Sequence, residues 1–423
     1  MYDIATTLAA PLGAVRLALS SRHRPLLRRF APPVPPLPER PIWIQACSVG
    51  EVSVAKSLLG ALRERWPDTP VLLTCSTVAG RAQADSACAD VARAWFPFDH
   101  ALSVRRFIRQ ARPRALVLVE TELWPNVLRG ARRHGVPVVI VNGRLSDKHF
   151  PRYRRFRRWL RPALRCITAA GMQNQEYAGR LAELGVDPGA IHVTGNTKFD
   201  GVATDVPAET RARLRAENGF QEDQPILLFG STRPGDETLA SQCWRELREE
   251  FPALRLVIAP RHLKRLDEAT APFDEPLLFR SQVREGRAPA GERVLILDTM
   301  GELVAFYASA TVAVIGGSFF PGVEGHNPLE PAALGVPTVF GPYMRNFVDP
   351  ARVLVEGGGA EQVARPDELA GALRVLLRDP ERRAAMAARG RAAVLANRGA
   401  IGRNLDVLEA VLEGDDAPQE GAG

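Results

Sequence analysis

The chain has 423 residues, more than a single hydrophobic core usually holds, so we expect two domains. Its 46% hydrophobic and 24% charged residues are typical of a globular protein and exclude a disordered or collagen-like chain. The net charge of +7 favours an anionic partner: nucleic acid, an acidic membrane surface or a phosphorylated substrate. Five cysteines without metal-ligand spacing indicate buried thiols in a reducing compartment, so we predict neither disulfides nor a zinc site.

The first 30 residues are predicted to form a membrane-associated segment. Residues 4–20 are mostly small and apolar, but this run is shorter than the roughly 20 residues that a spanning helix needs. A basic cluster that includes Arg24, Arg28 and Arg29 follows it. The pattern favours an interfacial helix on the inner leaflet, and a surface helix packed on the first domain is the alternative.

Short apolar runs alternate with amphipathic segments through residues 31–202, the predicted first domain. We predict strands at residues 42–46, 71–74, 115–119, 138–141 and 167–172. These runs are rich in Val, Ile and Leu without strict alternation, which is typical of strands buried on both faces of a parallel sheet. Helix-like stretches such as residues 54–65 and 104–110 lie between them. The repetition predicts a doubly wound domain.

The same rhythm restarts after a polar linker at residues 201–224, which contains one predicted helix at residues 208–218. Strands are predicted at residues 226–229, 254–259, 294–297, 311–315 and 336–340. Residues 203–385 form the predicted second domain, and residues 386–423 a C-terminal helix and tail. The predicted fold class is α/β, with two Rossmann-like doubly wound domains that face a cleft where ligands bind.

Acidic side chains follow two strands of the predicted first domain. After the first strand, Ser48 can cap a helix, Gly50 lets a backbone come close, and Glu51 can accept a proton from a hydroxyl. The alternative for Glu51 is a helix N-terminal carboxylate stabilised by the helix dipole. Glu120 and Glu122 follow the third strand, where they contact either acceptor hydroxyls or loop amides.

A basic tract at residues 144–165 interleaves aromatic residues with arginines. Phe150, Tyr153, Phe156 and Trp159 recur every three residues, so one helix would gather them along a single stripe flanked by arginines. Such a surface suits lipid headgroups and sugar-linked phosphates. A nucleic-acid site and a plain solvated basic face are the alternatives.

Polar and glycine-rich segments follow the strands of the predicted second domain. The candidate residues are Ser231, Thr232, Arg261, His262, Met300, Gly301, Glu302, Gly317, Ser318, Asn327 and Glu330. Any one segment is a weak signal, because glycines and caps at βα turns are routine. Together at one sheet edge they predict a nucleotide site, with helix amides near residue 298 on a phosphate and Glu330 on ribose hydroxyls.

The motifs together resemble one family. The segments S-V-G-E-V, E-T-E-L-W-P-N, V-N-G-R-L-S, G-N-T-K-F-D, P-R-H, D-T-M-G-E-L and G-H-N-P-L-E-P occur in this order between residues 42 and 347. They are similar to the 3-deoxy-D-manno-octulosonic acid (Kdo) transferases of lipopolysaccharide synthesis. The resemblance implies a GT-B glycosyltransferase that moves Kdo from CMP-Kdo, with inversion, to a lipid A precursor on the cytoplasmic face of the bacterial inner membrane. It implies neither metal nor cofactor, and no nucleic acid.

The resemblance also implies roles for individual residues. Glu51 would be the base, Glu120 and Glu122 would line the acceptor side, and Lys198 would stabilise the leaving phosphate. CMP would be held by Arg261, His262, Met300, Gly301, Asn327 and Glu330.

Three positions depart from the usual family pattern: Gln45 in place of His, Arg233 in place of His, and Glu324 in place of Gly. They leave other readings open: a transferase for a different nucleotide sugar, a nucleotide-sugar epimerase of the same fold, or a non-enzymatic membrane or nucleic-acid binder.

Overall fold

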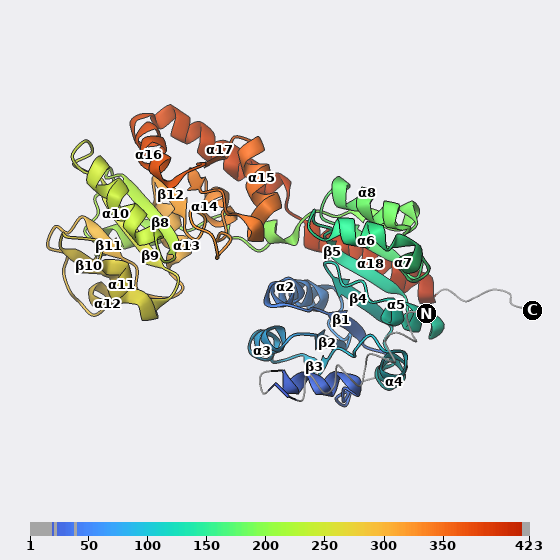
Figure 1. Ribbon diagram of the computed structural model, residues 1–423. Coiled ribbons are helices and arrows are strands. Elements are labelled where there is room, and N and C mark those ends of the chain that lie inside the picture. The colour runs from blue at the N-terminus through green and yellow to red at the C-terminus, as the bar shows by residue number, and fades with distance from the viewer. Residues whose placement is uncertain (1–18, 21–22, 38–39, 417–423) are drawn as a thin grey trace, which may run out of the picture. The chain divides into compact units, whose positions relative to one another are not determined.

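The computed structural model describes residues 19–20, 23–37 and 40–416, and these form two compact units (Figure 1). Unit 1 contains the chain up to Asp200 and again from Arg398, and unit 2 contains Gly201–Asn397. The last helix therefore returns to the unit in which the chain began. Most of the predicted membrane-associated segment, residues 1–18, lies outside the described residues. Among those described, none of the helices combines the length and the apolarity needed to cross a membrane.

Unit 1 is built on a parallel sheet of order β3-β2-β1-β4-β5-β6-β7. Its strands are β1 Ile42–Gln45, β2 Val71–Cys75, β3 Ala92–Trp95, β4 Ala115–Val119, β5 Val138–Gly143, β6 Ala169–Met172 and β7 Ile191–Val193. The central strands are buried along their whole length, which explains their unbroken apolar runs. The strand order reverses between β1 and β4, the position where open α/β sheets bind ligands.

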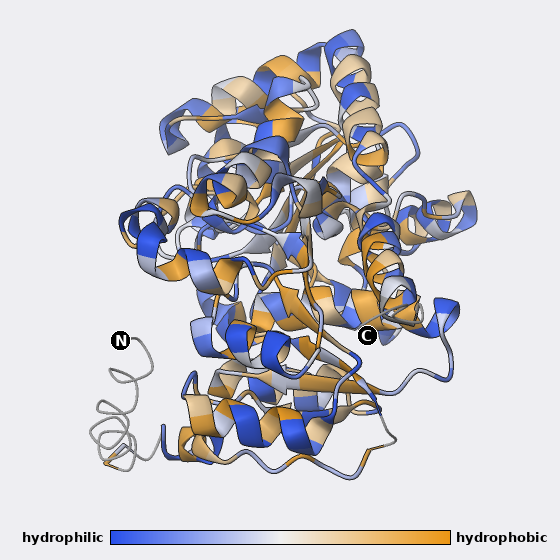
Figure 2. Ribbon diagram, turned by 90° about the vertical axis from the view of Figure 1, so that its right-hand side faces the viewer, coloured by the Kyte–Doolittle hydropathy of each residue, from blue (hydrophilic) through white to orange (hydrophobic). Residues whose placement is uncertain are grey.

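Helices cover both faces of this sheet. They are η1 Arg24–Phe30, α2 Val49–Arg65, α3 Val78–Ala87, α4 Ala101–Ala111, α5 Pro125–Arg133, α6 Phe150–Arg155, α7 Arg157–Leu164, α8 Gln175–Leu184, η2 Pro188–Ala190, η3 Thr197–Phe199 and α18 Ala400–Asp416. Apolar side chains of α2, α3 and α18 pack on one face, and those of α4, α5, α7 and α8 on the other. The amphipathic pattern of these helices is visible in Figure 2.

Unit 2 repeats the architecture with the parallel order β10-β11-β9-β8-β12-β13-β14. Its strands are β8 Ile226–Thr232, β9 Arg255–Pro260, β10 Leu277–Phe279, β11 Val294–Ile296, β12 Val312–Ile315, β13 Thr338–Phe340 and β14 Ala360–Gln362. Its helices are α9 Ala208–Glu217, α10 Asp236–Leu247, η4 Leu263–Arg265, α11 Leu266–Thr270, α12 Arg280–Arg284, α13 Leu303–Ser309, α14 Leu329–Ala333, η5 Arg345–Phe347, α15 Val348–Glu356, η6 Pro366–Glu368, α16 Leu369–Arg378 and α17 Pro380–Ala396. The predicted α/β class with two doubly wound units is confirmed.

Three local predictions differ from the structure. The basic tract forms two helices that break at Phe156, so its aromatics do not share one stripe: Phe150 and Tyr153 pack on the core, whereas Phe156 and Trp159 are exposed. The single C-terminal helix predicted for residues 386–423 is two helices: α17, which already starts at Pro380, and α18, which Gly399, with φ 85°, precedes. Arg29 is buried rather than free for a membrane surface.

The return of the chain to unit 1 is fixed by polar contacts at the start of α18. The Asp200 carboxylate accepts hydrogen bonds from the amides of Gly399 and Ile401, each at 2.6 Å. The fully buried Asn404 accepts through Oδ1 from the amide of Asn142 and from Thr194 Oγ1, both at 3.2 Å. The last helix therefore completes the side of unit 1 that carries β5, β6 and η3.

We expect Asp200→Ala to lower the stability of unit 1, because two amides at the start of α18 lose their acceptor. Loss of a helix-capping side chain costs about 1–2 kcal/mol. The exposed Asp205→Ala is the matched control. Thermal melts followed by circular dichroism should show a lower midpoint for Asp200→Ala alone, and equal midpoints would contradict this role.

Candidate active site

Glu51 lies in the first turn of α2 with its carboxylate folded back over the start of the helix. Ser48 is the N-cap: its Oγ accepts from the Glu51 amide at 3.4 Å and donates to Glu51 Oε1 at 2.9 Å. The Cys47 amide donates to Glu51 Oε2 at 2.7 Å. These reciprocal bonds form a capping arrangement, so the structural role that the sequence left open for Glu51 exists in the molecule. They also hold the carboxylate in one orientation.

The carboxylate of Glu51 lies close to a thiol and to a second acidic side chain. Cys47 Sγ and one carboxylate oxygen from each of Glu51 and Glu122 all lie within 4.8 Å of one another. Burial, then the charge of Glu122 and that of Glu120, raise the pKa of Glu51 to about 8. Burial and the charge of Glu122 also raise the pKa of the Cys47 thiol to about 12. A carboxylate with a pKa near the working pH is suited to accept a proton, and such shifts are common at functional sites.

A second group of buried side chains fixes Glu122. Trp124 Nε1 donates to Glu122 Oε2 at 2.7 Å, and the fully buried Gln45 donates through Nε2 to the same oxygen at 3.3 Å. Burial still raises the pKa of Glu122, although these two bonds oppose the rise. In the sequence, Gln45 was noted only as a departure from the family pattern. Its contact with Glu122 could not be predicted, because the two residues are 77 positions apart.

Arg29 is a buried cation of this region. Its guanidinium is engaged by backbone carbonyls inside unit 1 and is therefore not available to a membrane surface. Its Nε donates to the Phe96 carbonyl at 2.9 Å and its Nη1 to the Ser76 carbonyl at 3.0 Å. Burial lowers the pKa of Arg29 to about 10, and its charge lowers the pKa of Glu122. Arg29 therefore connects η1 to the ends of β2 and β3.

Glu120 directly follows β4 and lies in the left-handed region, with φ 60°, a conformation that non-glycine residues seldom adopt and that often marks a functional site. Burial raises its pKa, and the charges of Lys198 and Arg144 oppose this rise. Lys198, in η3, thus lies beside Glu120. An added Cβ at Gly50 would meet only Ser48 Oγ, at 3.9 Å, so the space in front of Gly50 is open.

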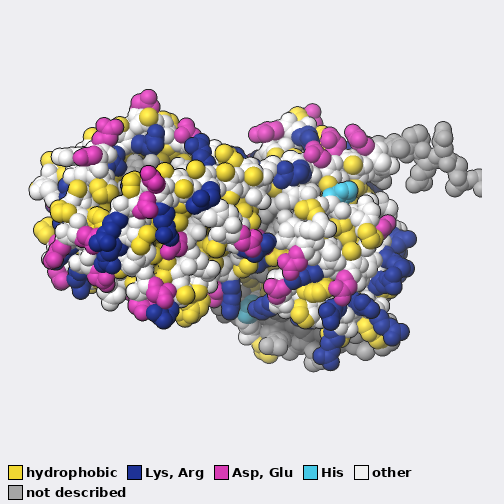
Figure 3. All heavy atoms as spheres, turned by 90° about the horizontal axis from the view of Figure 1, so that it is seen from above, with side chains coloured by type: hydrophobic (Ala, Val, Ile, Leu, Met, Phe, Trp, Pro, Cys, Tyr) yellow, Lys and Arg dark blue, Asp and Glu magenta, His cyan; other side chains and the backbone are white. Residues whose placement is uncertain are grey.

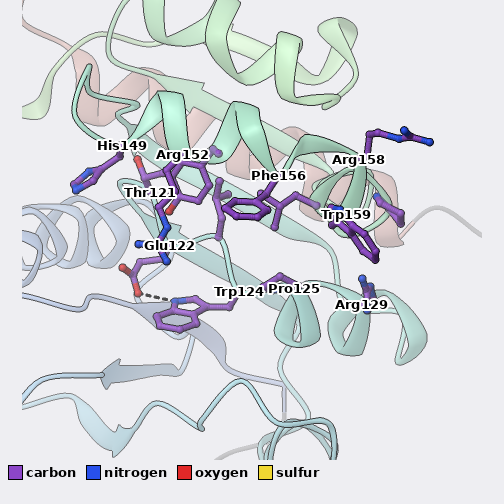
Figure 4. A pocket seen from close by; sticks show the side chains of 14 residues that line it. Thr121, Glu122, Trp124, Pro125, Arg129, His149, Arg152, Phe156, Arg158 and Trp159 are labelled. Carbon is purple, nitrogen blue, oxygen red and sulfur yellow. Dashed lines mark hydrogen bonds between the residues drawn. The ribbon is translucent and has the colours of Figure 1, made fainter. Parts of the chain in front are cut away.

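A pocket of about 990 Å³ begins at Glu122 and extends along α6 and α7 (Figure 4). Thr121 and Glu122 line one end of it, and Phe156 and Trp159 line the other. The side chain of Phe156 points into the space that Figure 4 shows. Phe156 is 48% exposed and Trp159 60% exposed, so the apolar part of the pocket opens to solvent.

In unit 2, the residues predicted to bind a nucleotide all lie at one edge of the sheet. They end β8, follow β9, β11 or β12, or lie at the start of α14, and these strands are neighbours in the order β11-β9-β8-β12. Because the strands are parallel, their carboxyl ends share that edge. The sheet therefore brings these loops together as the sequence predicted.

Three of these side chains are engaged within the protein. Thr232 Oγ1 donates to Glu237 Oε1 at 2.9 Å. Ser318 Oγ donates to the Ile315 carbonyl at 2.5 Å and accepts from the Gly341 amide at 2.9 Å. Glu302 forms an ion pair with Arg280 at 2.8 Å. These residues hold the loops in place.

Other candidates remain available to a ligand. Met300 is 72% exposed, which is unusual for so large an apolar side chain, and Arg261 and His262 are also exposed. Asn327 Nδ2 donates to Glu330 Oε1 at 3.3 Å, while burial raises the pKa of Glu330.

Positive φ angles shape three loops of this edge: 58° at Ser231, 85° at Gly301 and 68° at Gly317. They turn the backbone sharply where β8 and β12 end and before α13 begins.

Sequence reasoning missed Asp236 and His326 at this edge. Asp236 is buried, and its Oδ2 accepts from the amides of Gly317 and Arg233 at 2.6 and 2.9 Å, so it connects the loops after β8 and β12. Burial raises the pKa of Asp236 to about 6. His326 stands inside the G-H-N segment, and that motif was the available signal for it.

Comparisons with known proteins bear on both units. The family model described as 3-deoxy-D-manno-octulosonic-acid transferase (kdotransferase) matches residues 21–201. A 3-deoxy-D-manno-octulosonic acid transferase of Bordetella pertussis is 35% identical, over 87% of this chain and 87% of its own length. One of Haemophilus influenzae is 32% identical, over 89% and 88%.

Solved structures share the fold. An Anabaena protein in complex with UDP has a TM-score of 0.57 at 15% identity, covering 88% of this chain and 100% of its own. The UDP-GlcNAc 2-epimerase of Neisseria meningitidis has a TM-score of 0.55 at 14% identity, covering 88% and 99%. The structural likeness shows the fold alone. The family is assigned from the sequence relatives, which match nearly the whole chain. This chain belongs to the 3-deoxy-D-manno-octulosonic acid transferase family and is a glycosyltransferase of GT-B fold.

Proposed function

We propose that this protein transfers Kdo from CMP-Kdo to a lipid A precursor, with inversion and with Glu51 as the general base. The proposal rests on the geometry and the pKa of Glu51. Its carboxylate is held by the Cys47 amide and Ser48 Oγ, and its pKa is raised to about 8. Unit 1 binds the acceptor in this account, and unit 2 binds the donor.

The chemistry requires one proton acceptor. Glu51 takes the proton of the acceptor hydroxyl as its oxygen bonds to the anomeric carbon of Kdo, and the bond from that carbon to the phosphate oxygen breaks. CMP leaves with the electron pair. One displacement inverts the anomeric centre. Glu120 and Glu122 raise the proton affinity of Glu51 through their charges and line the acceptor side.

The donor is assigned to the edge of unit 2. Arg261, His262, Met300, Gly301, Asn327 and Glu330 contact CMP in this proposal. Exposed Met300 offers an apolar surface to the base, and the Glu330 carboxylate suits the ribose hydroxyls. Thr232, Ser318 and Glu302 act indirectly, by fixing the loops that carry these groups.

The apolar pocket of unit 1 supports a lipid acceptor. It connects Glu122, beside the proposed base, with Phe156 and Trp159 at the surface, and Arg152 and Arg158 lie along it (Figure 4). Acyl chains fit the aromatic part, and arginines suit the phosphates of the acceptor. Basic side chains also gather along the outer edge of unit 1 in Figure 3, at right. We infer peripheral binding to the cytoplasmic face of the inner membrane.

The direct test of function is the mass of the lipid product. Purified protein is incubated with CMP-Kdo, generated in place, and a tetra-acylated lipid A precursor. We expect the lipid to gain one or more Kdo units. A lipid of unchanged mass, with CMP-Kdo intact, would contradict the proposal.

Glu51→Gln should lower the transfer rate by about 10²–10⁴-fold, the usual loss when a general base is removed. The affinity for CMP should not change, because that site lies in unit 2. Glu64→Gln, an exposed change on the same helix, is the control. Rates come from the mass assay and affinities from calorimetry; a rate for Glu51→Gln near that of the wild type would refute the role.

Glu51→Gln should also change how stability depends on pH. The folded-state pKa of Glu51 is raised to about 8 from 4.5, so its protonated form is favoured by folding. The associated stability is present below pH 4.5 and is lost as the pH rises towards 8. Relative to wild type, the variant should therefore gain melting temperature between pH 5 and pH 9. A difference that stays constant over this range would contradict the shift.

The double variant Phe156→Ala, Trp159→Ala should raise KM for the tetra-acylated acceptor by at least about tenfold, since even one aromatic side chain contributes roughly 1.5–3 kcal/mol when it is buried. It should not affect KM for a deacylated, water-soluble acceptor. Leu395→Ala, an exposed apolar change in unit 2, is the control. Equal effects on both acceptors would show that the pocket does not bind the acyl chains.

A further inference from the structure

Two side chains at the edge of unit 2, Arg233 and His326, have no role in the account so far. Arg233 follows β8, Arg261 and His262 follow β9, and His326 lies between β12 and α14. Strands β9, β8 and β12 are neighbours in the sheet, so these side chains come from three adjacent loops. The charges of Arg261, Arg233 and His262 all act on His326.

Two nitrogen atoms of these side chains are buried without a hydrogen-bond partner. Arg233 Nε and His326 Nε2 are both inaccessible to solvent and form no hydrogen bond. Buried polar groups are nearly always paired in folded proteins, so two unpaired nitrogens in adjacent loops are unusual. Burial, followed by the charges of its neighbours, lowers the pKa of His326 to about 4. An incoming anion would supply an acceptor to Arg233 Nε and, in the tautomer that carries its proton on Nε2, to His326.

The acidic residues nearby do not fill this need. Asp236 directs Oδ2 to the amides of Arg233 and Gly317, and Asp236 Oδ1 has no partner either. The Glu330 carboxylate accepts from Asn327. Neither carboxylate bonds Arg233 Nε or His326 Nε2.

The backbone around the group is fixed before any ligand binds. The Arg261 amide donates to the Thr232 carbonyl at 3.1 Å, which joins the loops after β8 and β9. An added Cβ at Gly316 would lie 2.5 Å from the Ser231 carbonyl oxygen, so the loops after β8 and β12 are in direct contact. His326 is held through its amide by the Gly316 carbonyl at 3.3 Å. A preformed site of this kind loses little conformational freedom on binding.

We propose that Arg233 and His326, flanked by Arg261 and His262, form an oxyanion subsite of unit 2. It takes a phosphate or a carboxylate, and under the proposed function, on which this assignment rests, that group belongs to the donor. CMP-Kdo offers both chemistries, the phosphate of the nucleotide and the carboxylate of the sugar acid. Arg233 is a specificity-determining residue in either case, because a planar guanidinium binds oxyanions in a fixed geometry.

Calorimetry on the full chain tests the subsite with four probes: CMP, cytidine, pyrophosphate and CMP-Kdo. Arg233→Met removes the charge and keeps the length of the side chain, and His326→Gln removes the ring. Arg233→Lys retains the charge, and Arg211→Met, an exposed change on α9, is the control. Circular dichroism melts establish that each variant is folded.

If the subsite takes the phosphate, Arg233→Met weakens CMP and pyrophosphate binding by about 10- to 100-fold and leaves cytidine unchanged, with partial recovery in Arg233→Lys. If it takes the carboxylate, binding of CMP-Kdo weakens while binding of CMP does not. Either result supports the subsite. Unchanged affinity for all four probes, in both Arg233→Met and His326→Gln, would overturn it while leaving the proposed function standing.

The wild-type protein separates the two claims. Pyrophosphate binding that depends on Arg233, without binding of CMP or CMP-Kdo, would retain the oxyanion subsite and reject the proposed donor. A wild-type protein that binds none of the probes would overturn the subsite.

Discussion

The constraint on which the site of unit 1 depends is the convergence of parallel strands at one sheet edge. Strands β1 and β4 are neighbours, so Glu51, just beyond β1, and Glu122, just beyond β4, are brought close together. Burial makes the repulsion between these two carboxylates strong. A cluster of this kind holds a proton at a pH where an isolated carboxylate would have lost it. The acidic loops would not meet in a sheet of another order.

The same edge explains why a capping residue can also serve as a base. The bonds from the Cys47 amide and Ser48 Oγ lower the pKa of Glu51, whereas burial and the charges of Glu122 and Glu120 raise it more. The capping contacts orient the carboxylate, and the neighbouring charges set its proton affinity. The structural and catalytic interpretations of Glu51 are therefore compatible.

Unit 2 presents the opposite electrostatic character at its own edge. There, nitrogens of Arg233 and His326 are buried without hydrogen-bond partners, whereas in unit 1 the carboxylates of Glu51 and Glu122 lie close together. A transfer reaction needs both: a base for the attacking hydroxyl and positive or hydrogen-bonding groups for an anionic donor. Two units of the same architecture thus provide different chemistry through the residues that follow their strands.

The sequence predicted most of the interior of both sheets, because strands buried on both faces must be apolar. It missed strands near the edges: β3 contains the partly exposed Arg93, and β7 has only three residues, with His192 exposed. Candidate residues that directly follow the buried strands were identifiable, because the apolar runs show where those strands end.

Gln45 and Arg29 were not identified as parts of the site, since their roles depend on partners distant in the chain. Residues such as Thr232 and Ser318 were selected by position, and only the structure shows that their hydroxyls are engaged within the protein.

The central claim is that a Glu51 carboxylate with a raised pKa removes the proton from the acceptor. The most direct measurement is the pH dependence of kcat/KM for transfer, which reports groups of the free enzyme, the state described by the structure. The account predicts that kcat/KM rises with pH, levels off near pH 8, where Glu51 loses its proton, and loses this limb in Glu51→Gln. A profile that is flat between pH 6 and pH 9, or a limb that persists in Glu51→Gln, would contradict it.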